Sequence, residues 1–413
     1  GDPPEDLSSF CDTPFGEDLT LVPLSRMQEE AVIGCAMRRC TLIRGPPGTG
    51  KTHTACAIVD TWLRQFQALS GAVSRSRVLV VTQSNVGALN IQERMDQFHI
   101  HAVRVGMQLR ADELLSQRYF RDNLEPEDIR ALERASREGD DGGLKSLLLP
   151  LLAKAAKRAP VVVMTCISSG NMALLGGQNF SRVLLDEAAQ ATEPTSLVPL
   201  TTGAAAFACV GDDRQLPAVV RTRAAEALGL GESLFERLLK SGVCCGGDGF
   251  VQLDVQRRMH SNLAWFPSKM FYSGELQTGI DDEERPPVPG MRWPDGGRCR
   301  VVFVECAGLP GAGQHARGTS LENPAEADAL VAVLHALRDA SAQAGDDLNV
   351  AAIACYAAQK TYLERRLTPA GFRGGKGRLA GRRGDPADAA AAAGGAGVRV
   401  DTVDGFQGME RDL

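Results

Sequence analysis

The chain has 413 residues, 44% of them hydrophobic, and a formal net charge of −6 at pH 7. This length fits two to three domains with sizeable hydrophobic cores. The net negative charge argues against a protein that binds nucleic acid over its whole surface, but it leaves room for a local basic groove. Because no apolar run approaches the roughly 20 residues of a membrane span, we expect a soluble globular protein without a membrane partner.

Eleven cysteines are scattered along the chain, and no two of them form a C-x-x-C pair. Cys56, Cys166, Cys209 and Cys355 lie within apolar strand or helix patterns, which indicates buried thiols. Reduced thiols are typical of the cytosol or the nucleus, and the spacing predicts no structural zinc site.

Residues 1–23 are acidic and rich in proline, so we predict a disordered lead or the tail of an upstream domain. The chain starts without a methionine and stops inside a patterned segment. We therefore expect a fragment at both ends.

A helix is predicted to begin after residue 24, with Ser25 as its cap and Gln28 in its first turn. The carboxamide of Gln28 offers a donor and an acceptor, the pair needed to read the N6/N7 edge of adenine. A solvated helix face explains a single glutamine equally well. What favours the adenine role is the position of Gln28 shortly before the next motif.

Residues 45–52 form the motif G-x-x-x-x-G-K-T between the end of an apolar strand and the start of a helix. Glycines in such a loop let successive backbone N–H groups turn toward a phosphate at the helix N-terminus. Lys51 would then reach the β- and γ-phosphates of a nucleoside triphosphate, and the hydroxyl of Thr52 would coordinate Mg²⁺. The residues predicted to contact the nucleotide here are Gly45, Pro46, Pro47, Gly48, Thr49, Gly50, Lys51, Thr52 and His53.

The apolar run at residues 182–185 ends in two adjacent carboxylates, Asp186 and Glu187. Asp186 is predicted to hold Mg²⁺ through water, while Glu187 is placed to polarise the attacking water. The next predicted strand, residues 206–210, leads to Gln215. Its amide would donate to the γ-phosphate or to the attacking water; the alternative is an ordinary polar turn.

An earlier apolar run, residues 77–82, is typical of a parallel strand covered on both faces. Ser84 and Asn85 follow it at the end of the strand where ligand sites of open α/β sheets lie. Residues 106–158 then interrupt the alternation of strand and helix with helical periodicity. We predict a helical insertion there, before the sheet resumes at residues 161–165.

The second half of the chain repeats the strand and helix pattern without a phosphate loop. We predict strands at residues 301–304, 349–354 and 398–402 and helices at residues 325–340 and 359–367. The predicted organisation is therefore a first lobe at residues 24–240 and a second lobe at residues 241–413, with one nucleotide at the seam. Residues 373–397 are rich in glycine and alanine and are predicted to form a flexible surface loop.

Taken in chain order, these motifs resemble those of the superfamily-1 helicases. The similarity is greatest to the helicase core of the nonsense-mediated-decay (up-frameshift) RNA helicases and their senataxin-like relatives, and it covers residues 24–413. It implies an α/β fold of two tandem RecA-like parallel-sheet lobes, and a P-loop NTPase with ATP and Mg²⁺ as cofactors. Gln28 matches the family's adenine-reading glutamine, and Asp186 and Gln215 fall in its second and third motifs.

In the second lobe, residues 255–260 are similar to the family's Q-Y-R-M-H segment. The resemblance implies that Arg258 reaches the γ-phosphate across the seam. Arg257 stands where the family usually has a tyrosine stacked on adenine, and a guanidinium plane can stack in the same place. The last residues are similar to motif V, which implies that Glu410 bonds the ribose and that the backbone near Gly408 follows the nucleotide state.

The resemblance also implies that Ser84, Asn85, Thr165 and Thr402 contact a nucleic-acid strand, mostly at its phosphates and therefore without reading its sequence. The implied function is ATP-dependent translocation and unwinding along single-stranded nucleic acid, RNA rather than DNA, in the 5′-to-3′ direction. We expect a monomer that meets regulatory protein partners through regions outside this chain.

The same motifs fit an ATP-gated clamp that grips RNA or a protein without unwinding, and a DNA-directed helicase of the same superfamily. A P-loop small-molecule kinase fits less well, because it needs no second lobe with an F-Q-G-x-E segment. Since the family's second arginine motif would lie beyond residue 413, we expect this chain to bind ATP but to hydrolyse it slowly.

Overall fold

The contacts between residues divide the chain into two compact units. Unit 1 holds the residues up to Arg258 together with Pro267–Gly279, and unit 2 holds Met259–Phe266 and the residues from Ile280 onward. The computed structural model describes residues 24–68, 76–106, 109–139, 141–242, 249–288, 291–344, 348–374 and 396–406.

The division falls later in the chain than the predicted lobe boundary between residues 240 and 241. The cause is β7 (Phe250–Gln252), which pairs in parallel with β1 (Cys40–Arg44) and so extends the sheet of unit 1. A strand of three residues gives too short a pattern to be recognised in the sequence.

In the described residues, unit 1 is built on a seven-stranded sheet in the order β3-β4-β2-β5-β6-β1-β7. Every neighbouring pair in this sheet is parallel. The other strands are β2 (Val78–Thr82), β3 (Ala102–Arg104), β4 (Val161–Thr165), β5 (Arg182–Leu185) and β6 (Ala206–Gly211). The strands predicted from apolar runs in the first half of the chain are thus confirmed.

Successive side chains of these strands point to opposite faces of the sheet. In β2, Val78 and Val80 belong to one buried cluster, and Leu79 and Val81 belong to the other. The first cluster is covered by α1 (Arg26–Met37), α2 (Lys51–Ala68) and α3 (Asn85–Gln97). The second is covered by α7 (Asp141–Arg158), α8 (Met172–Leu175) and α11 (Leu234–Ser241).

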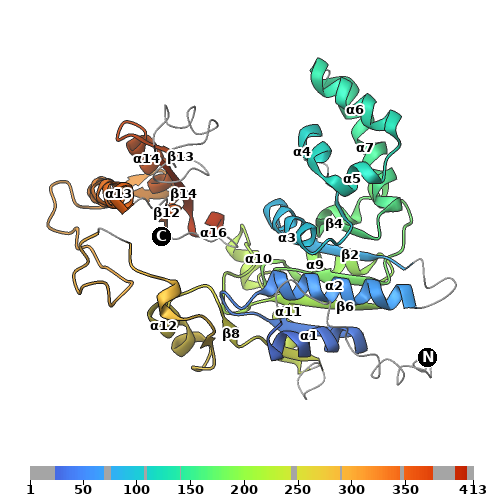
Figure 1. The fold of residues 1–413 in the computed structure, drawn as a ribbon, viewed down its shortest axis with the longest axis horizontal. Helices are drawn as coiled ribbons and strands as arrows, with labels where there is room; N and C mark the ends of the chain where they lie inside the picture. Colours follow the sequence, from blue (N-terminus) through green and yellow to red (C-terminus); the bar gives the residue numbers. More distant parts are fainter. Residues whose placement is uncertain are drawn as a thin grey trace. The chain divides into compact units, whose positions relative to one another are not determined.

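The predicted helical insertion lies between β3 and β4. It consists of α4 (Ala111–Ser116), α5 (Arg118–Asp122), α6 (Pro126–Glu138) and α7. Figure 1 shows the first three of these helices grouped beside α7. Leu114, Phe120 and Leu132 are fully buried in the same cluster as the second face of the sheet, so the insertion extends the core of unit 1.

The remaining elements of unit 1 are short. They are η3 (Ile167–Gly170), η4 (Ala188–Gln190), α9 (Glu193–Leu200), α10 (Arg223–Ala227) and the parallel pair β8 (Val255–Gln256) and β9 (Gln277–Thr278). One helix, α12 (Ser261–Phe271), has residues in both units. Pro267 stands where its assignment changes from unit 2 to unit 1.

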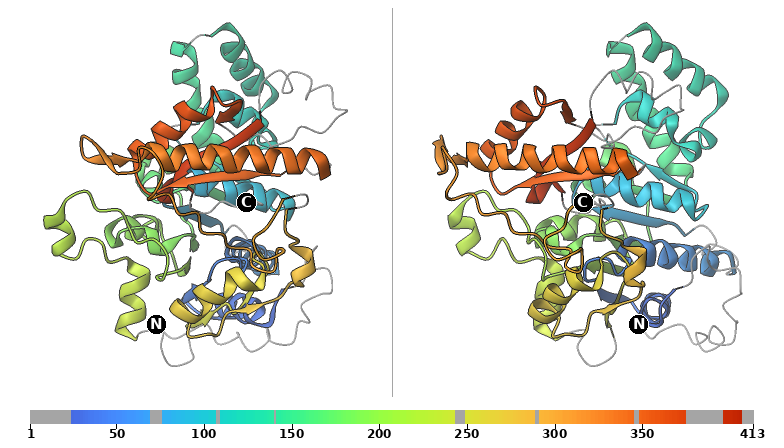
Figure 2. Two further views of the ribbon diagram at one scale, coloured as in Figure 1. Left: turned by 90° about the vertical axis from the view of Figure 1, so that its left-hand side faces the viewer. Right: turned by 60° about the vertical axis from the view of Figure 1, so that its left-hand side comes forward.

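Unit 2 has a smaller parallel sheet, in the order β12-β14-β13. Its main elements are α13 (Pro324–Ala344), β12 (Val350–Ala354), α14 (Ala357–Leu367), β13 (Phe372–Gly374) and β14 (Ala396–Thr402). Figure 2 shows α13 lying along this sheet. The minor elements are η5 (Asp282–Glu284), the hairpin of β10 (His315–Arg317) and β11 (Ser320–Glu322), and α16 (Val403–Phe406).

Four of the five predicted elements of the second half are confirmed, and one is wrong. Residues 301–304 form no strand, and their side chains are between 44% and 85% exposed. An apolar run marks a strand only when a neighbouring strand pairs with it and a helix covers it. In the part of the chain that the structure describes, no strand pairs with these residues.

Cys56, Cys166 and Cys209 are buried, as predicted, and burial raises the pKa of the Cys166 thiol to about 12. Cys355 is exposed, contrary to the prediction, because it follows the end of β12 rather than lying within it. No helix among the described residues is both long and apolar enough to cross a membrane.

Candidate nucleotide-binding site

Most of the predicted site residues of unit 1 follow strands that end at one edge of its sheet. Because all its strands are parallel, their carboxyl ends meet at this edge, which we call the carboxyl edge. Arg44 pairs with Gly211 at the ends of β1 and β6, and Thr82 pairs with Thr165 at the ends of β2 and β4. The segments that follow β1, β2, β4, β5 and β6 therefore come together there.

The loop between β1 and α2 has the conformation that its glycines were expected to allow. Gly48 and Gly50 have φ angles of 76° and 80°, in the region that disfavours other residues. A Cβ atom on Gly45 would meet Cγ of Lys51 at 2.2 Å. Lys51 Nζ donates a hydrogen bond to the carbonyl oxygen of Gly45 at 2.8 Å. The lysine thus folds over a glycine-lined cradle that has no room for side chains.

Gln28 joins the start of α1 to this loop. Its Oε1 accepts from the backbone N–H of Ser25 at 2.8 Å, in a capping box, and its Nε2 donates to the carbonyl oxygen of Thr49 at 2.9 Å. Both ends of the carboxamide that was predicted to read adenine are therefore engaged within the chain. In this arrangement Gln28 supports the phosphate loop, and adenine reading stays a prediction.

His53 contacts Phe98 and Arg94. It is buried in α2, its ring lies 5.0 Å from that of Phe98, and its Nδ1 is 3.2 Å from Nη2 of Arg94 on α3. This side chain packs between two helices, and its contact with the nucleotide stays a prediction.

Asp186 and Glu187 follow β5 at the carboxyl edge. Asp186 is only 5% exposed, and its Oδ1 accepts a hydrogen bond from the backbone N–H of Glu187 at 3.0 Å. Burial raises the pKa of the Asp186 carboxyl well above its ordinary range, the neighbouring Glu187 raises it further, and Lys51 opposes both effects. Glu187 Oε2 accepts from Gln190 Nε2 at 2.8 Å.

These residues fit a bound Mg²⁺. The ion prefers hard oxygen ligands and is usually held by one or two carboxylates together with substrate phosphates. Asp186 and the Thr52 hydroxyl are donors of this kind, and the Asp186 charge is only partly offset by Lys51 within the chain. A divalent cation would complete that compensation.

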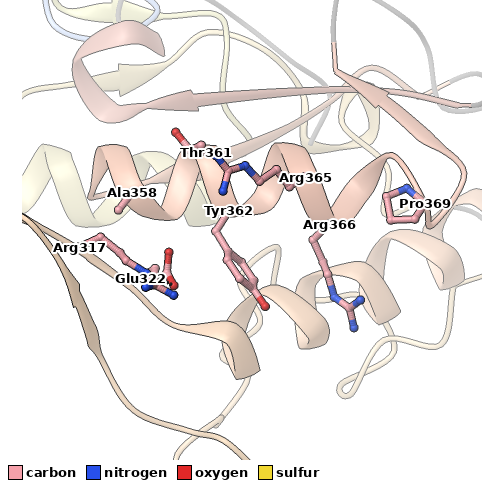
Figure 3. Close-up of a pocket in the computed structure, with 8 residues that line it drawn as sticks. All are labelled: Arg317, Glu322, Ala358, Thr361, Tyr362, Arg365, Arg366 and Pro369. Carbon is pink, nitrogen blue, oxygen red and sulfur yellow. Dashed lines mark hydrogen bonds and ion pairs between the residues drawn. The ribbon is translucent and has the colours of Figure 1, made fainter.

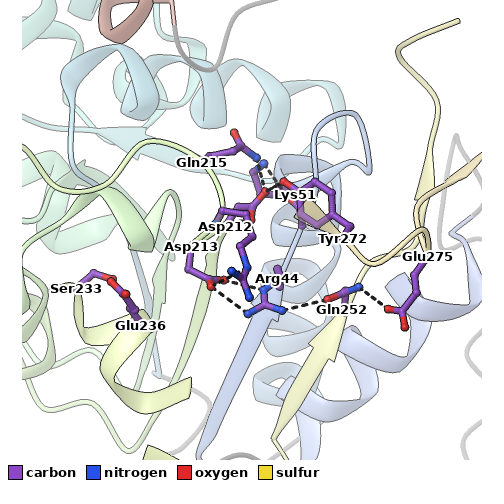
Figure 4. A network of polar contacts seen from close by, with 12 residues as sticks. Arg44, Lys51, Asp212, Asp213, Gln215, Ser233, Glu236, Gln252, Tyr272 and Glu275 are labelled. Atoms are coloured by element: carbon purple, nitrogen blue, oxygen red, sulfur yellow. Dashed lines mark hydrogen bonds and ion pairs between the residues drawn. The ribbon is translucent and has the colours of Figure 1, made fainter. Parts of the chain in front are cut away.

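Gln215 belongs to a buried hydrogen-bond network around Asp212 (Figure 4). The Asp212 side chain accepts from the backbone N–H of Arg214 at 3.1 Å, from Nε2 of Gln215, and from the hydroxyl of Tyr272 at 2.7 Å. Tyr272 was not among the predicted site residues, because it lies 60 residues further along the chain. The only signal in the sequence was the pair of carboxylates directly after β6.

The second of these carboxylates, Asp213, is held from another direction. Arg44 donates to it twice, from Nε at 2.7 Å and from Nη2 at 3.1 Å, which is a bidentate pair. Arg44 Nη1 also donates to Gln252 at 3.2 Å, and Gln252 Nε2 donates to Glu275 at 3.1 Å. Figure 4 shows this chain of contacts running from the turn after β6 to the segment around Glu275.

Arg257 and Arg258 lie against the phosphate loop in space. The backbone N–H of Arg257 donates to the carbonyl oxygen of Gly48 at 2.9 Å, and a Cβ atom on Gly48 would meet Cβ of Arg258 at 2.7 Å. Arg258 was predicted to reach the nucleotide from the second lobe, but its contacts place it in unit 1. The reason is that β7 pairs with β1 of the first sheet and β8 pairs with β9, which also belongs to unit 1.

The predicted nucleic-acid residues are divided between the units. Ser84 caps α3, accepting from the backbone N–H of Gly87 at 3.0 Å, and Asn85 is the first residue of that helix. Thr165 Oγ1 donates to Ser168 at 2.8 Å. These residues of unit 1 lie at its carboxyl edge.

Thr402 ends β14 in unit 2, where its Oγ1 accepts from the backbone N–H of Gly405 at 3.2 Å. Gly408 and Glu410 lie outside the described residues, as do residues 1–23 and most of the loop at residues 373–397.

Unit 2 contains a cavity of about 600 Å³ beside α14 that includes none of the predicted site residues (Figure 3). Arg317 pairs there with Glu322 at 2.7 Å, and Arg366 pairs with Asp328 at 2.6 Å. The charges of these two arginines are thus already matched within the chain. The cavity is lined by Arg317, Glu322, Ala358, Thr361, Tyr362, Arg365, Arg366 and Pro369.

Two family models, both described as an AAA domain, match the chain. One matches residues 23–141 and 127–223, and the other matches residues 230–413.

Among curated proteins, the chain is similar to a regulator of nonsense transcripts 1 homolog of Arabidopsis thaliana, with 33% identity over 74% of this chain and 24% of that protein. It is 34% identical to ATP-dependent helicase NAM7 of Saccharomyces cerevisiae, over 68% of this chain and 29% of that protein. It is also 34% identical to ATP-dependent helicase upf1 of Schizosaccharomyces pombe, over 67% of this chain and 31% of that protein. The chain spans between about a quarter and a third of the length of these relatives.

Proposed function

The chain belongs to the superfamily-1 helicases of the nonsense-mediated-decay type, and from this we propose that it is the motor core of an ATP-dependent helicase on single-stranded nucleic acid. One observation carries the proposal. The phosphate loop, the carboxylates after β5, Gln215 and Arg258 all belong to unit 1; the strands before the first three end at its carboxyl edge, and Arg258 lies against Gly48 of the loop.

In the proposed reaction Lys51 leaves the Gly45 carbonyl and neutralises the β- and γ-phosphates of ATP. Asp186 and Thr52 would hold Mg²⁺, which withdraws charge from the phosphate oxygens. Glu187 accepts a proton from water while the water oxygen bonds to the γ-phosphorus. The bond from that phosphorus to its bridging oxygen breaks, and ADP leaves with the electron pair.

Arg258 is proposed to stabilise the negative charge that spreads over the transferring phosphoryl group. Its backbone lies against Gly48, so its side chain starts from the rim of the phosphate loop. An arginine in this role is typically worth about 10³ to 10⁵ in rate.

We propose that the strand is held mainly through its phosphates by Ser84, Asn85, Thr165 and Thr402, which makes binding indifferent to sequence. RNA is the favoured strand, because the Arabidopsis relative is named for the regulation of nonsense transcripts. The proposed direction of movement is 5′ to 3′, as the resemblance to this family implies.

The test uses the intact protein and two assays. ATP hydrolysis is measured with poly-ribo and poly-deoxy single strands, and strand displacement is measured on duplexes that carry a 5′ or a 3′ single-stranded tail. We expect stronger stimulation by the ribo strand and displacement from the 5′ tail only. ATP-responsive binding without displacement from either tail would contradict the helicase and favour a clamp, and stimulation by the deoxy strand alone would contradict the choice of RNA.

A further inference from the structure

Tyr272 completes the network that holds Gln215. It follows the last residue of α12, and its backbone N–H donates to Ser268 at 3.1 Å, so it continues the helical turn. Its side chain is 5% exposed, and its hydroxyl donates to Oδ2 of Asp212, which is itself 3% exposed. Burial and the neighbouring Asp212 both raise the pKa of the Tyr272 hydroxyl, so this group stays protonated and remains a donor.

The chemistry of Asp212 fixes which way the Gln215 amide faces. Gln215 donates from its NH₂ group to Oδ2 of Asp212, so its oxygen is turned away from that carboxylate. The two ends of an amide are otherwise nearly indistinguishable by shape. Figure 4 shows the nitrogen of Gln215 directed at Asp212 and Tyr272 and the oxygen directed away from them. Among the described residues, no group donates to that oxygen.

Both carboxylates after β6 are tied to the segment Pro267–Gly279, which returns from unit 2 to unit 1. Tyr272 bonds Asp212 directly, while Glu275 is joined to Asp213 through Gln252 and Arg44. Two separate chains of contacts thus fix the same turn from the same segment. The side chains of Asp212 and Asp213 are therefore each held by hydrogen bonds from this part of unit 1.

We propose that Tyr272 is a positioning residue for ATP hydrolysis: through Asp212 it holds the Gln215 amide with Oε1 free to accept a hydrogen bond from the attacking water. This inference rests on the proposed ATPase function. The proposal assigns Gln215 a different hydrogen bond from the one expected from the sequence. An amide held in this way accepts a hydrogen bond from the attacking water and so orients it, and its NH₂ group does not donate to the γ-phosphate. Tyr272 itself touches neither water nor nucleotide.

The first test compares Tyr272→Phe, Gln215→Ala and the double variant in the intact protein, with ATP hydrolysis measured under nucleic-acid stimulation. Tyr272→Phe keeps the buried ring and loses only the hydroxyl. We expect kcat to fall by about tenfold while KM for ATP changes by less than about twofold, since nucleotide binding does not use this network. The double variant should be no slower than Gln215→Ala alone, because both changes remove the same oriented amide.

A purely structural role would give a different pattern. Losses of Tyr272→Phe and Gln215→Ala that multiply in the double variant would overturn the proposal, as would a rise in KM with kcat unchanged. The matched control is Tyr362→Phe on α14, which removes a tyrosine hydroxyl in unit 2 and should leave kcat and KM unchanged.

A second variant, Asp212→Asn, tests the orientation of the amide. An asparagine NH₂ group can donate to Gln215 Oε1, so the amide is free to turn over without a change in shape. We expect kcat to fall to the level of Gln215→Ala with ATP affinity retained. Wild-type kcat in this variant would overturn the proposal. Failure of the proposed ATPase function would give a different result, because the wild-type protein itself would then show no stimulated ATP hydrolysis.

Discussion

Both units are built on parallel sheets covered by helices, but the carboxyl ends of their strands carry different side chains. In unit 1, β1 ends in a glycine-lined loop and β5 ends in two carboxylates. In unit 2, β12 is followed by the exposed residues Cys355 and Tyr356, and β14 ends at Asp401 and Thr402. The Asp401 carboxylate forms ion pairs with Lys360 at 2.9 Å and with Arg399 at 3.1 Å.

The carboxylates Asp186 and Asp401 differ in how far their charges are compensated by other side chains of the chain. In unit 1 the buried charge of Asp186 is only partly compensated within the chain, which favours the binding of a cation there. In unit 2 the Asp401 carboxylate is paired with two cationic side chains, those of Lys360 and Arg399. We infer that the chemistry is assembled in unit 1 and that the described part of unit 2 contributes surfaces rather than reacting groups.

The largest expected effect comes from Glu187→Gln. This change removes the proposed base but keeps the shape of the side chain, so kcat for stimulated ATP hydrolysis in the intact protein should fall by about 10²- to 10⁴-fold. Nucleotide binding, measured with a fluorescent ATP analogue, should persist. The control is Glu193→Gln, which breaks an exposed ion pair with Arg237 and should have little effect on kcat. A loss below about fivefold for Glu187→Gln would contradict its role.

The independence of the two units is tested by Leu334→Ala. Leu334 is 1% exposed in the core of unit 2, and its truncation should cost about 2 to 5 kcal/mol of unfolding free energy. Because the candidate site lies in unit 1, the affinity for the fluorescent ATP analogue should be retained at temperatures where unit 1 is folded. Loss of nucleotide binding in parallel with the unfolding of unit 2 would refute the assignment of the site to unit 1.

A smaller effect is expected for Gly50→Ala. Gly50 has a φ of 80°, and an added Cβ would meet Nε2 of Gln28 at 2.7 Å. The left-handed backbone alone costs about 1 to 2 kcal/mol for a residue with a side chain. We expect nucleotide affinity to fall by roughly tenfold, since the loop must shift to relieve the contact.

The matched control is Gly139→Ala at the end of α6, where φ is 65° and an added Cβ meets no atom within 4 Å. This variant carries the same backbone strain away from the site. It should lose stability and keep its nucleotide affinity. Equal losses of affinity in both variants would mean that the contact with Gln28 has no importance.

The smallest effect concerns the ion pairs of Asp401. The hydrogen bond from Lys360 lowers the pKa of the Asp401 carboxyl, burial opposes this, and Arg399 lowers the pKa further. A carboxyl whose pKa is lower in the folded than in the unfolded protein stabilises the fold at pH values above its unfolded pKa of about 4. This contribution is lost as the pH falls through its folded pKa.

We therefore expect Asp401→Asn to destabilise the protein by about 1 kcal/mol at pH 7, and the difference from wild type to shrink as the pH falls below about 4. Urea denaturation at a series of pH values measures this. A difference that grows toward acid pH would contradict the sign of the effect.

The first sheet was predictable because its strands are covered on both faces. The apolar runs ending at Thr82, Thr165 and Leu185 each became a strand with most or all of its residues buried. Such strands read as continuous apolar segments, and the polar residues that follow them then mark the carboxyl edge. The positions of Asp186 and Gln215 after their strands were predicted in this way, and the phosphate loop was predicted from its G-x-x-x-x-G-K-T motif.

The remainder depends on contacts that no local pattern encodes. Tyr272 reaches Asp212 across 60 residues of chain, and no local pattern in the sequence predicts this contact. The segment 301–304 has the composition of a strand, yet it pairs with no strand among the described residues. Arg258 has a recognisable motif, but only the pairing of β7 with β1 shows which unit holds it.

The most direct test of the account is the rate of nucleic-acid-stimulated ATP hydrolysis in the intact protein with Lys51 replaced by alanine. Lys51 lies over the glycine-lined cradle, with Nζ 2.8 Å from the Gly45 carbonyl oxygen, and every proposed step begins with its transfer to the phosphates. The account predicts a loss of at least about 10²-fold, with the protein still folded. Turnover equal to that of wild type would contradict the assignment of the nucleotide site.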